Sequence, residues 1–201
     1  MQVTGITTQR LRLPLAPPFH AAWDIAPREC FDATIVRVHT DEGITGIASG
    51  DTMSGLAEFE SLFVGRDPLA LAAHARTLEI SFHAGRYWPL EAALWDLAGQ
   101  ALGTPVAMLL GGALARLPAY ASLGELRPPG QRADDAQALV QAGFRALKVR
   151  IAPHRLAEGI AVVAAIRDAV GDALEILVDL NQWWRMAGDI KPGLGPRMRA
   201  G

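Results

Sequence analysis

The sequence has 201 residues, half of them apolar, and a formal net charge of -2 at pH 7. This composition supports one or two folded domains, and it excludes a strongly basic nucleic-acid-binding protein and an acidic disordered chain. Cys30 is the only cysteine, so no internal disulfide can form and a reducing compartment is favoured. The chain shows no signal peptide and no apolar run of the roughly 20 residues that a membrane span needs. We therefore expect a soluble, cytoplasmic protein with no membrane or nucleic-acid partner.

The first third of the chain predicts β-structure. Gly43 is typical of a hairpin turn, and a proline-rich loop is expected at 14–27. This loop carries His20 and Trp23, which are candidates for lining a pocket, although packing of such a loop on its own domain is the commoner arrangement. The alternation of polar and apolar residues predicts an antiparallel meander of three strands at 3–13, 33–40 and 44–49.

The second third predicts helices. From Trp88 to about Ala101 the apolar residues recur at i, i+3, i+4 and i+7, so one face of this helix is expected to be buried. Gly103 suits its C-terminal cap. Asp96 lies off the apolar face, and we expect it to be solvated. Shorter helices are predicted at 67–78 and 104–110.

The last third alternates between strands and helices with short connections, which predicts a parallel sheet with right-handed crossovers. The change of pattern lies between Leu114 and Pro118, where we place a domain boundary. The residues from Asp189 onward are rich in Gly, Pro and Arg, and we expect them to be loose. The predicted strands are at 117–121, 146–151 and 175–179, and the predicted helices are at 134–142 and 156–170.

Two cations, Lys148 and Arg150, lie on one predicted buried strand. They share a face of the sheet, because side chains alternate along a strand. Two cations that point into a sheet or barrel interior are costly unless an anion meets them. Either an anionic group faces these side chains or they lie at the end of the strand and reach water, and the pattern leaves both readings open.

An acid, Asp179, directly follows the apolar run at 176–178. It is predicted at the carboxyl end of a parallel strand, where α/β sheets and barrels place ligands. Its carboxylate could hold a hard divalent cation, or it could cap the segment that follows. Asn181 is predicted to share the face of Asp179. The sequence contains no glycine-rich phosphate-binding motif, no Cys-x-x-Cys pair and no Gly-x-Ser-x-Gly motif.

Taken together, these segments resemble the mandelate racemase and muconate-lactonizing family of the enolase superfamily. The resemblance implies an α+β capping domain at 1–114, followed at 115–188 by the start, about three βα units, of a TIM-type (β/α) barrel, with a loose tail at 189–201. The likeness extends to about Ala187 and is carried, in order, by residues 36–46, 91–112, 118–122, 143–150 and 178–181.

The resemblance also implies a chemistry. A divalent metal, usually Mg²⁺, is held by three carboxylates, of which Asp179 would be the first, and the proton α to a substrate carboxylate is abstracted. Lys148 and Arg150 would occupy the catalytic Lys-x-Lys positions. An arginine stays protonated at neutral pH, so Arg150 is a poor base, which favours an acid-sugar dehydratase with a later His base over a racemase or cycloisomerase. Substrate contacts would come from Asn181, His20 and Trp23.

The remaining residues of such a site are expected to be missing from this sequence. After Asp179 the only acid is Asp189, and no His follows His154. We therefore expect an incomplete site, whether the sequence represents a truncated product, a frameshifted reading or a domain fragment. The alternative reading is an inactive fragment whose capping domain serves binding or assembly. The expected partner is a small carboxylate such as a sugar acid, and a homo-oligomer stays open.

Overall fold

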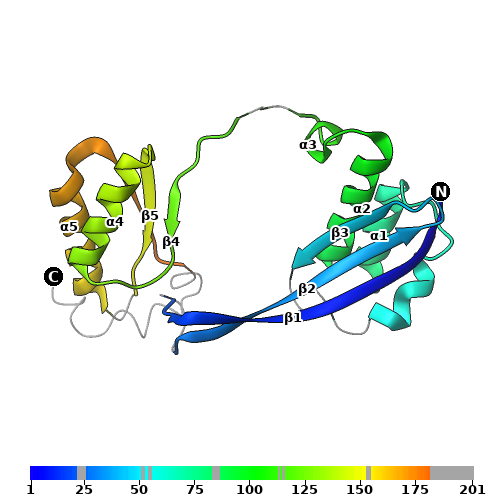
Figure 1. The fold of residues 1–201 in the computed structure, drawn as a ribbon, viewed down its shortest axis with the longest axis horizontal. Helices are drawn as coiled ribbons and strands as arrows, with labels where there is room; N and C mark the ends of the chain where they lie inside the picture. Colours follow the sequence, from blue (N-terminus) through cyan, green and yellow to red (C-terminus); the bar gives the residue numbers. More distant parts are fainter. Residues whose placement is uncertain are drawn as a thin grey trace. The chain divides into compact units, whose positions relative to one another are not determined.

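The structure is a computed structural model that describes residues 1–21, 26–50, 53, 56–82, 87–112, 114, 116–152 and 155–181. The chain divides into two compact units, Met1–Pro14 with Cys30–Ala115 and Leu15–Glu29 with Arg116–Gly201 (Figure 1). Trp23 and the tail at 189–201 lie outside the described residues. Among the described helices, none combines the length and the apolar character that crossing a bilayer requires.

The strands β1 (Val3–Phe19), β2 (Arg28–Thr40) and β3 (Thr45–Gly50) form a sheet in the order β1-β2-β3. β2 and β3 pair in antiparallel register, with His39 opposite Thr45. Gly43 lies in the turn between them at a φ of 80°, the left-handed conformation that glycine adopts most readily. The three predicted strands are therefore present.

The lengths of β1 and β2 show that the predicted loop at 14–27 is wrong in part. β1 continues to Phe19, and β2 begins at Arg28 rather than at Ala33. β1 lies at the edge of the sheet, where a residue without a backbone N–H is tolerated because one side of the strand donates to no neighbour. The prolines of β1 consequently do not end the strand.

The helices of the first unit match the prediction closely only for α2. This helix begins at Trp88, has Pro89 in its first turn, and ends at Gly103 in the left-handed conformation. Another helix begins at Leu71 instead of Asp67, because the Asp67 side chain accepts a hydrogen bond from the Leu69 amide at 2.9 Å and forms a turn before the helix. The helical segments are η1 (Leu56–Leu62), α1 (Leu71–Ser81), α2 (Trp88–Leu102) and α3 (Val106–Leu109).

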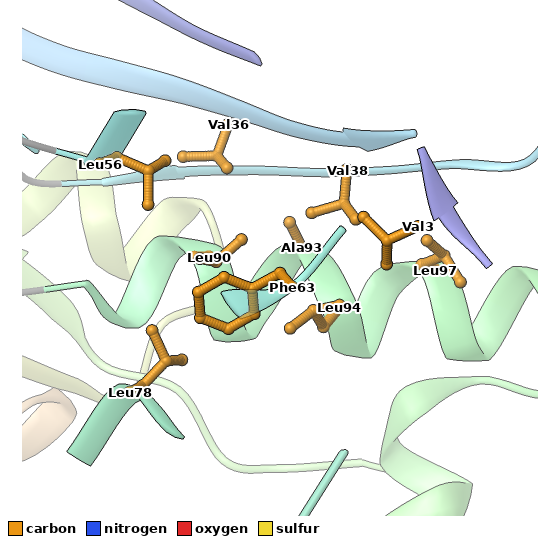
Figure 2. Packing of buried hydrophobic residues seen from close by; sticks show 10 residues of the cluster. All are labelled: Val3, Val36, Val38, Leu56, Phe63, Leu78, Leu90, Ala93, Leu94 and Leu97. Atoms are coloured by element: carbon orange, nitrogen blue, oxygen red, sulfur yellow. The ribbon is translucent and has the colours of Figure 1, made fainter. Parts of the chain in front are cut away.

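The core of the first unit lies between α2 and the sheet. Figure 2 shows the apolar side chains of α2 facing those of β1 and β2, with Phe63 beside them. The buried face of α2 is the one that the spacing predicts. The fully buried residues on this interface include Val3, Val36, Val38, Leu90, Ala93, Leu94 and Leu97.

Polar side chains of α2 also bind the backbone of β3. The Asp96 carboxylate accepts a hydrogen bond from the Ile47 amide at 2.8 Å, and Gln100 donates to the Thr45 carbonyl at 3.0 Å. The expectation that Asp96 is merely solvated is therefore wrong, because α2 lies close enough to this edge strand to satisfy its backbone groups. Gly46 permits this approach, since a side chain there would collide with the Ala93 carbonyl and the Leu97 side chain.

The second unit contains a parallel sheet in the order β4-β5-β6, as the alternation of strands and helices predicts. Its first strand lies later than the predicted 117–121, and its first helix begins at Pro129 rather than Asp134, because proline suits the first turn of a helix. The elements are β4 (Ala121–Leu123), α4 (Pro129–Gln141), β5 (Ala146–Arg150), α5 (Leu156–Val170), η3 (Gly171–Ala173) and β6 (Glu175–Asp179).

One face of β5 packs in the core of the second unit. Leu147 and Val149 are buried against apolar side chains of α4 and α5, and Ile166 of α5 is fully buried among them. Figure 1 shows both helices on the same side of β4 and β5. Because side chains alternate along a strand, Lys148 and Arg150 lie on the opposite face of the sheet.

We predict that Gly46→Ala destabilises the first unit by about 2 kcal/mol, because the new methyl group overpacks the interface between β3 and α2. The measurement is the free energy of opening of the α2 amides, obtained by native-state hydrogen exchange. Gly5→Ala is the matched control, since a side chain there meets only a Glu60 oxygen at 3.6 Å. Equal effects of the two substitutions would contradict the close approach of α2 to β3.

Candidate functional site

The register of β5 and β6 places two cations and an acid on one face of the second unit's sheet. Arg150 is the direct partner of Asp179, and Lys148 is the partner of Leu177. Partners in a parallel pair point to the same face, so Lys148, Arg150 and Asp179 all lie opposite the helices. Both strands end here, at the edge of the sheet where α/β proteins place their ligands.

The three side chains form one charge cluster. A single oxygen of Asp179, Oδ2, lies 3.3 Å from Lys148 Nζ and 3.4 Å from Arg150 Nε. The lysine side chain is 19% exposed and the arginine side chain 18%. The reading in which an anion meets the two cations is therefore the one that the structure supports.

The second oxygen of Asp179 caps the end of β6. Oδ1 accepts a hydrogen bond from the Asn181 amide at 2.7 Å. This bond is the largest cause of a lowered pKa for Asp179, and Lys148 and Arg150 lower that pKa further, against desolvation, which raises it. Of the two open interpretations of Asp179, the structure shows the cap, because Oδ1 accepts from the amide that follows the strand. The other oxygen pairs with the two cations, and the role of metal ligand stays a prediction.

The prediction that Asn181 shares the face of Asp179 assumed that the strand continues through Asn181, and it does not. β6 ends at Asp179, and Asn181 has a φ of 55°, in the left-handed region. Asparagine tolerates this conformation better than most side chains. Its observed role is to donate its backbone amide to the acid two residues earlier.

The sequence pattern does not reveal two further features of the site. The Tyr120 ring lies 5.3 Å from Lys148 Nζ, a cation–π distance that gives the ammonium a second contact. Arg150 also lines a cavity of about 410 Å³ together with residues of the β4–α4 loop and of α5. Both depend on the placement of the β4 region, which local periodicity does not specify.

His20 lies at the end of β1, in the second unit. Its side chain is exposed, and its carbonyl accepts a hydrogen bond from the Leu126 amide at 2.9 Å. The structure thus brings together three of the six predicted site residues, Lys148, Arg150 and Asp179. For His20 and Asn181 it shows hydrogen bonds of the backbone.

The described residues do not by themselves fit a Mg²⁺ ion. Among them no three acids, histidines or cysteines gather around a common point. Both oxygens of Asp179, the one predicted ligand, already meet cations or an amide hydrogen within the chain. A hard divalent cation takes about six oxygen ligands, far more than this carboxylate offers.

The lowered pKa of Asp179 predicts a pH-dependent contribution to stability. The ionised form is the bound form, so the contribution is complete above the ordinary Asp pKa of about 4 and is lost as the pH falls through the lower pKa of the folded state. We expect Asp179→Asn to lower the unfolding free energy of the second unit by about 1–2 kcal/mol at pH 7. Exchange of the β5 amides measures this free energy, and the difference from the wild type should shrink below about pH 4.

Asp172→Asn provides the control, because the Asp172 side chain is fully exposed and its nearest cation, on Arg167, lies 3.4 Å away. We expect that substitution to change the same free energy by less than about 0.5 kcal/mol. A constant difference between wild type and Asp179→Asn from pH 7 down to pH 2 would show that the charge of Asp179 is not what stabilises the end of β6.

Known proteins resemble the chain along most of its length. It is 28% identical over 204 residues to the L-Ala-D/L-Glu epimerase of Bacillus subtilis, covering 92% of this chain and 54% of that protein. It is 30% identical over 180 residues to the D-galactonate dehydratase of Variovorax paradoxus, covering 78% and 46%. The crystal structure of a dipeptide epimerase from Enterococcus faecalis, complexed with Mg and L-Leu-L-Tyr, matches with a TM-score of 0.74 at 26% identity, over 100% of this chain and 59% of that one.

The chain spans about half the length of the curated relatives it matches. These relatives include racemases, epimerases, cycloisomerases and acid-sugar dehydratases. A family model described as enolase C-terminal domain-like matches residues 131–193. The model of the mandelate racemase / muconate lactonizing enzyme N-terminal domain matches residues 4–111, more than half of the sequence. The chain therefore belongs to the mandelate racemase and muconate lactonizing enzyme family of the enolase superfamily.

Proposed function

We propose that this chain supplies the carboxylate-binding part of an enzyme that abstracts the proton α to a carboxylate, and that the enzyme is an acid-sugar dehydratase. The observation that carries the proposal is that Lys148 and Arg150 lie together on one face of the sheet, beside Asp179, at the carboxyl end of parallel strands. We assign residues 1–114 to a capping domain and 115–188 to the first part of the barrel.

The roles follow from the chemistry of the two cations. Arg150 presents a guanidinium that stays protonated, so it binds a carboxylate or a developing oxyanion and does not take a proton. Lys148 supports it electrostatically from the same face. When the proton α to the carboxylate leaves, negative charge grows on the carboxylate oxygens, and both cations stabilise that charge more strongly than they stabilise the substrate. Asn181 and His20 are proposed as further substrate contacts.

Asp179 is proposed as a magnesium ligand on the basis of the family, since solved relatives contain Mg. A bound Mg²⁺ would supply Lewis-acid stabilisation of the substrate carboxylate. In the described part of the chain, however, this acid is the counterion of Lys148 and Arg150. The chemistry proposed here therefore depends on the two cations.

The epimerases among the relatives support a second candidate. The epimerase of Bacillus subtilis aligns with 92% of this chain, a larger share than the dehydratase of Variovorax paradoxus. Racemisation or epimerisation by this site would require a base other than Arg150, with Lys148 as the candidate on β5. The third candidate is an inactive binding or assembly domain.

Turnover by the whole enzyme of which this chain is proposed to be a part, in deuterated buffer with Mg²⁺, separates these candidates. We expect D-galactonate or D-gluconate to lose one water, as detected by mass spectrometry, because a dehydratase eliminates the β-hydroxyl group. Arg150→Met should lower the rate roughly 100-fold, since it removes a cation from the growing charge. Arg145→Met is the control, because Arg145 is exposed and lies just before β5.

The other outcomes are distinct. Uptake of deuterium at the α-carbon of a dipeptide or a sugar acid, without loss of water, would contradict the dehydratase proposal and support an epimerase. An Arg150→Lys variant that gains such uptake would identify position 150 as the place of a base. Carboxylate binding is tested by calorimetric titration with galactonate. If neither turnover nor binding is observed, the remaining candidate is the inactive binding or assembly domain.

A further inference from the structure

The loop between β4 and α4 holds the end of β1 within the second unit. The Leu126 amide donates a hydrogen bond of 2.9 Å to the His20 carbonyl. Ala21 and Glu125 form an isolated antiparallel bridge next to it. Two consecutive residues of the loop thus pair with two consecutive residues after β1, so the position of one segment determines that of the other.

A buried arginine holds this loop in turn. Arg132, on the first turns of α4, is 4% exposed. It donates to the Asp135 carboxylate at 2.8 Å and to the Glu125 carbonyl. Arg127 completes the network, because it donates to Glu125 Oε2 at 2.8 Å and to the other oxygen of Asp135 at 3.2 Å.

The burial of Arg132 distinguishes this network from ordinary surface pairs. Arg155, the residue just before α5, and Glu158 form an ion pair with the same i,i+3 spacing, but both side chains are more than half exposed. Such exposed pairs contribute little to stability. A guanidinium as buried as that of Arg132 loses its hydration, which lowers its pKa, and only partners in fixed positions offset this cost. Its bond to a loop carbonyl therefore fixes the backbone of that loop.

We call the network of Arg132, Arg127, Glu125 and Asp135 the clamp. It lines two cavities of the second unit. Arg132 lines the cavity of about 410 Å³ that Arg150 lines, and it lines another of about 490 Å³ that Phe19 lines. Arg127 and Glu125 line both cavities as well. A movement of this loop would change the space beside Arg150 and the space at the end of β1 together.

We propose that Arg132 is a positioning residue that holds His20 and Ala21 through the β4–α4 loop, and so sets the position of the proposed substrate contact His20. The functional importance of His20 rests on the proposed function, whereas the clamp itself is a property of the fold. A buried Arg132 acts on the loop through the Glu125 carbonyl, and the loop acts on the end of β1 through the Leu126 amide.

Hydrogen exchange of single amides tests the clamp on the 201-residue chain. In Arg132→Met we expect the Leu126 amide to exchange about tenfold faster, because its bond to His20 loses its support. The amides of Leu147 and Val149 in the core of β5 should keep their protection. Asp135→Asn retains the shape of its side chain and removes the charge that holds Arg132, and it should accelerate the Leu126 amide to a smaller extent.

Arg155→Met is the matched control, and it should leave the Leu126 amide unchanged. Unchanged exchange of Leu126 in both Arg132→Met and Asp135→Asn would overturn the proposal. So would equal acceleration of Leu126 and the β5 amides in both variants, since the network would then stabilise the whole unit and not position the loop. These readouts need no substrate, so failure of the proposed function would leave them interpretable.

Discussion

The site depends on the register between β5 and β6. That register sets Arg150 beside Asp179 and leaves Lys148 within reach of the same carboxylate oxygen. A slip of one residue in β6 would turn the acid toward the helices, and a slip in β5 would turn the two cations toward them, so either slip would separate the cations from their anion. The apolar partners Leu147 and Ile176 secure the register from the other face, because both pack in the core under α4 and α5. Packing on one face therefore determines electrostatics on the other.

Relatives of several reaction types share the part of the family that this chain represents. Racemases, an epimerase, cycloisomerases and dehydratases all align with it over about a third to a little over half of their own lengths. We infer that this region contributes what their reactions have in common, and the carboxylate-binding role proposed for Lys148 and Arg150 would meet that requirement.

Local sequence patterns predicted those parts of the fold that local interactions determine. α2 was predictable at both ends, since Pro89 and Gly103 mark its termini and its apolar stripe has a helical period. The face shared by Lys148 and Arg150 was predictable because alternation along a strand is geometric. The full extent of β1 was not, since prolines end most strands and the edge position that tolerates them is a property of the whole sheet.

The clamp residue was missed for a related reason. With α4 predicted from Asp134, Arg132 fell in a loop and had no helical face. The Pro128-Pro129 pair was the signal that could have moved the start of the helix, and Arg132 and Ala136 would then have shared its buried face. The partners of Arg132, a loop carbonyl and the acid Asp135, become neighbours only when the loop folds back, so the burial of this charge was not readable from spacing.

The participation of β1 in both units has a consequence for the order of folding. His20 and Leu126 are about a hundred residues apart in the sequence, yet their backbones are hydrogen-bonded in the second unit. During synthesis the end of β1 leaves the ribosome long before its partner loop. Its backbone therefore stays unpaired while the sheet and α2 of the first unit form around the rest of the strand. Closing so long a loop is slow unless a folded element shortens it, and the first unit does so by occupying most of the intervening chain. The second unit is therefore expected to complete its folding last, after the first unit has folded.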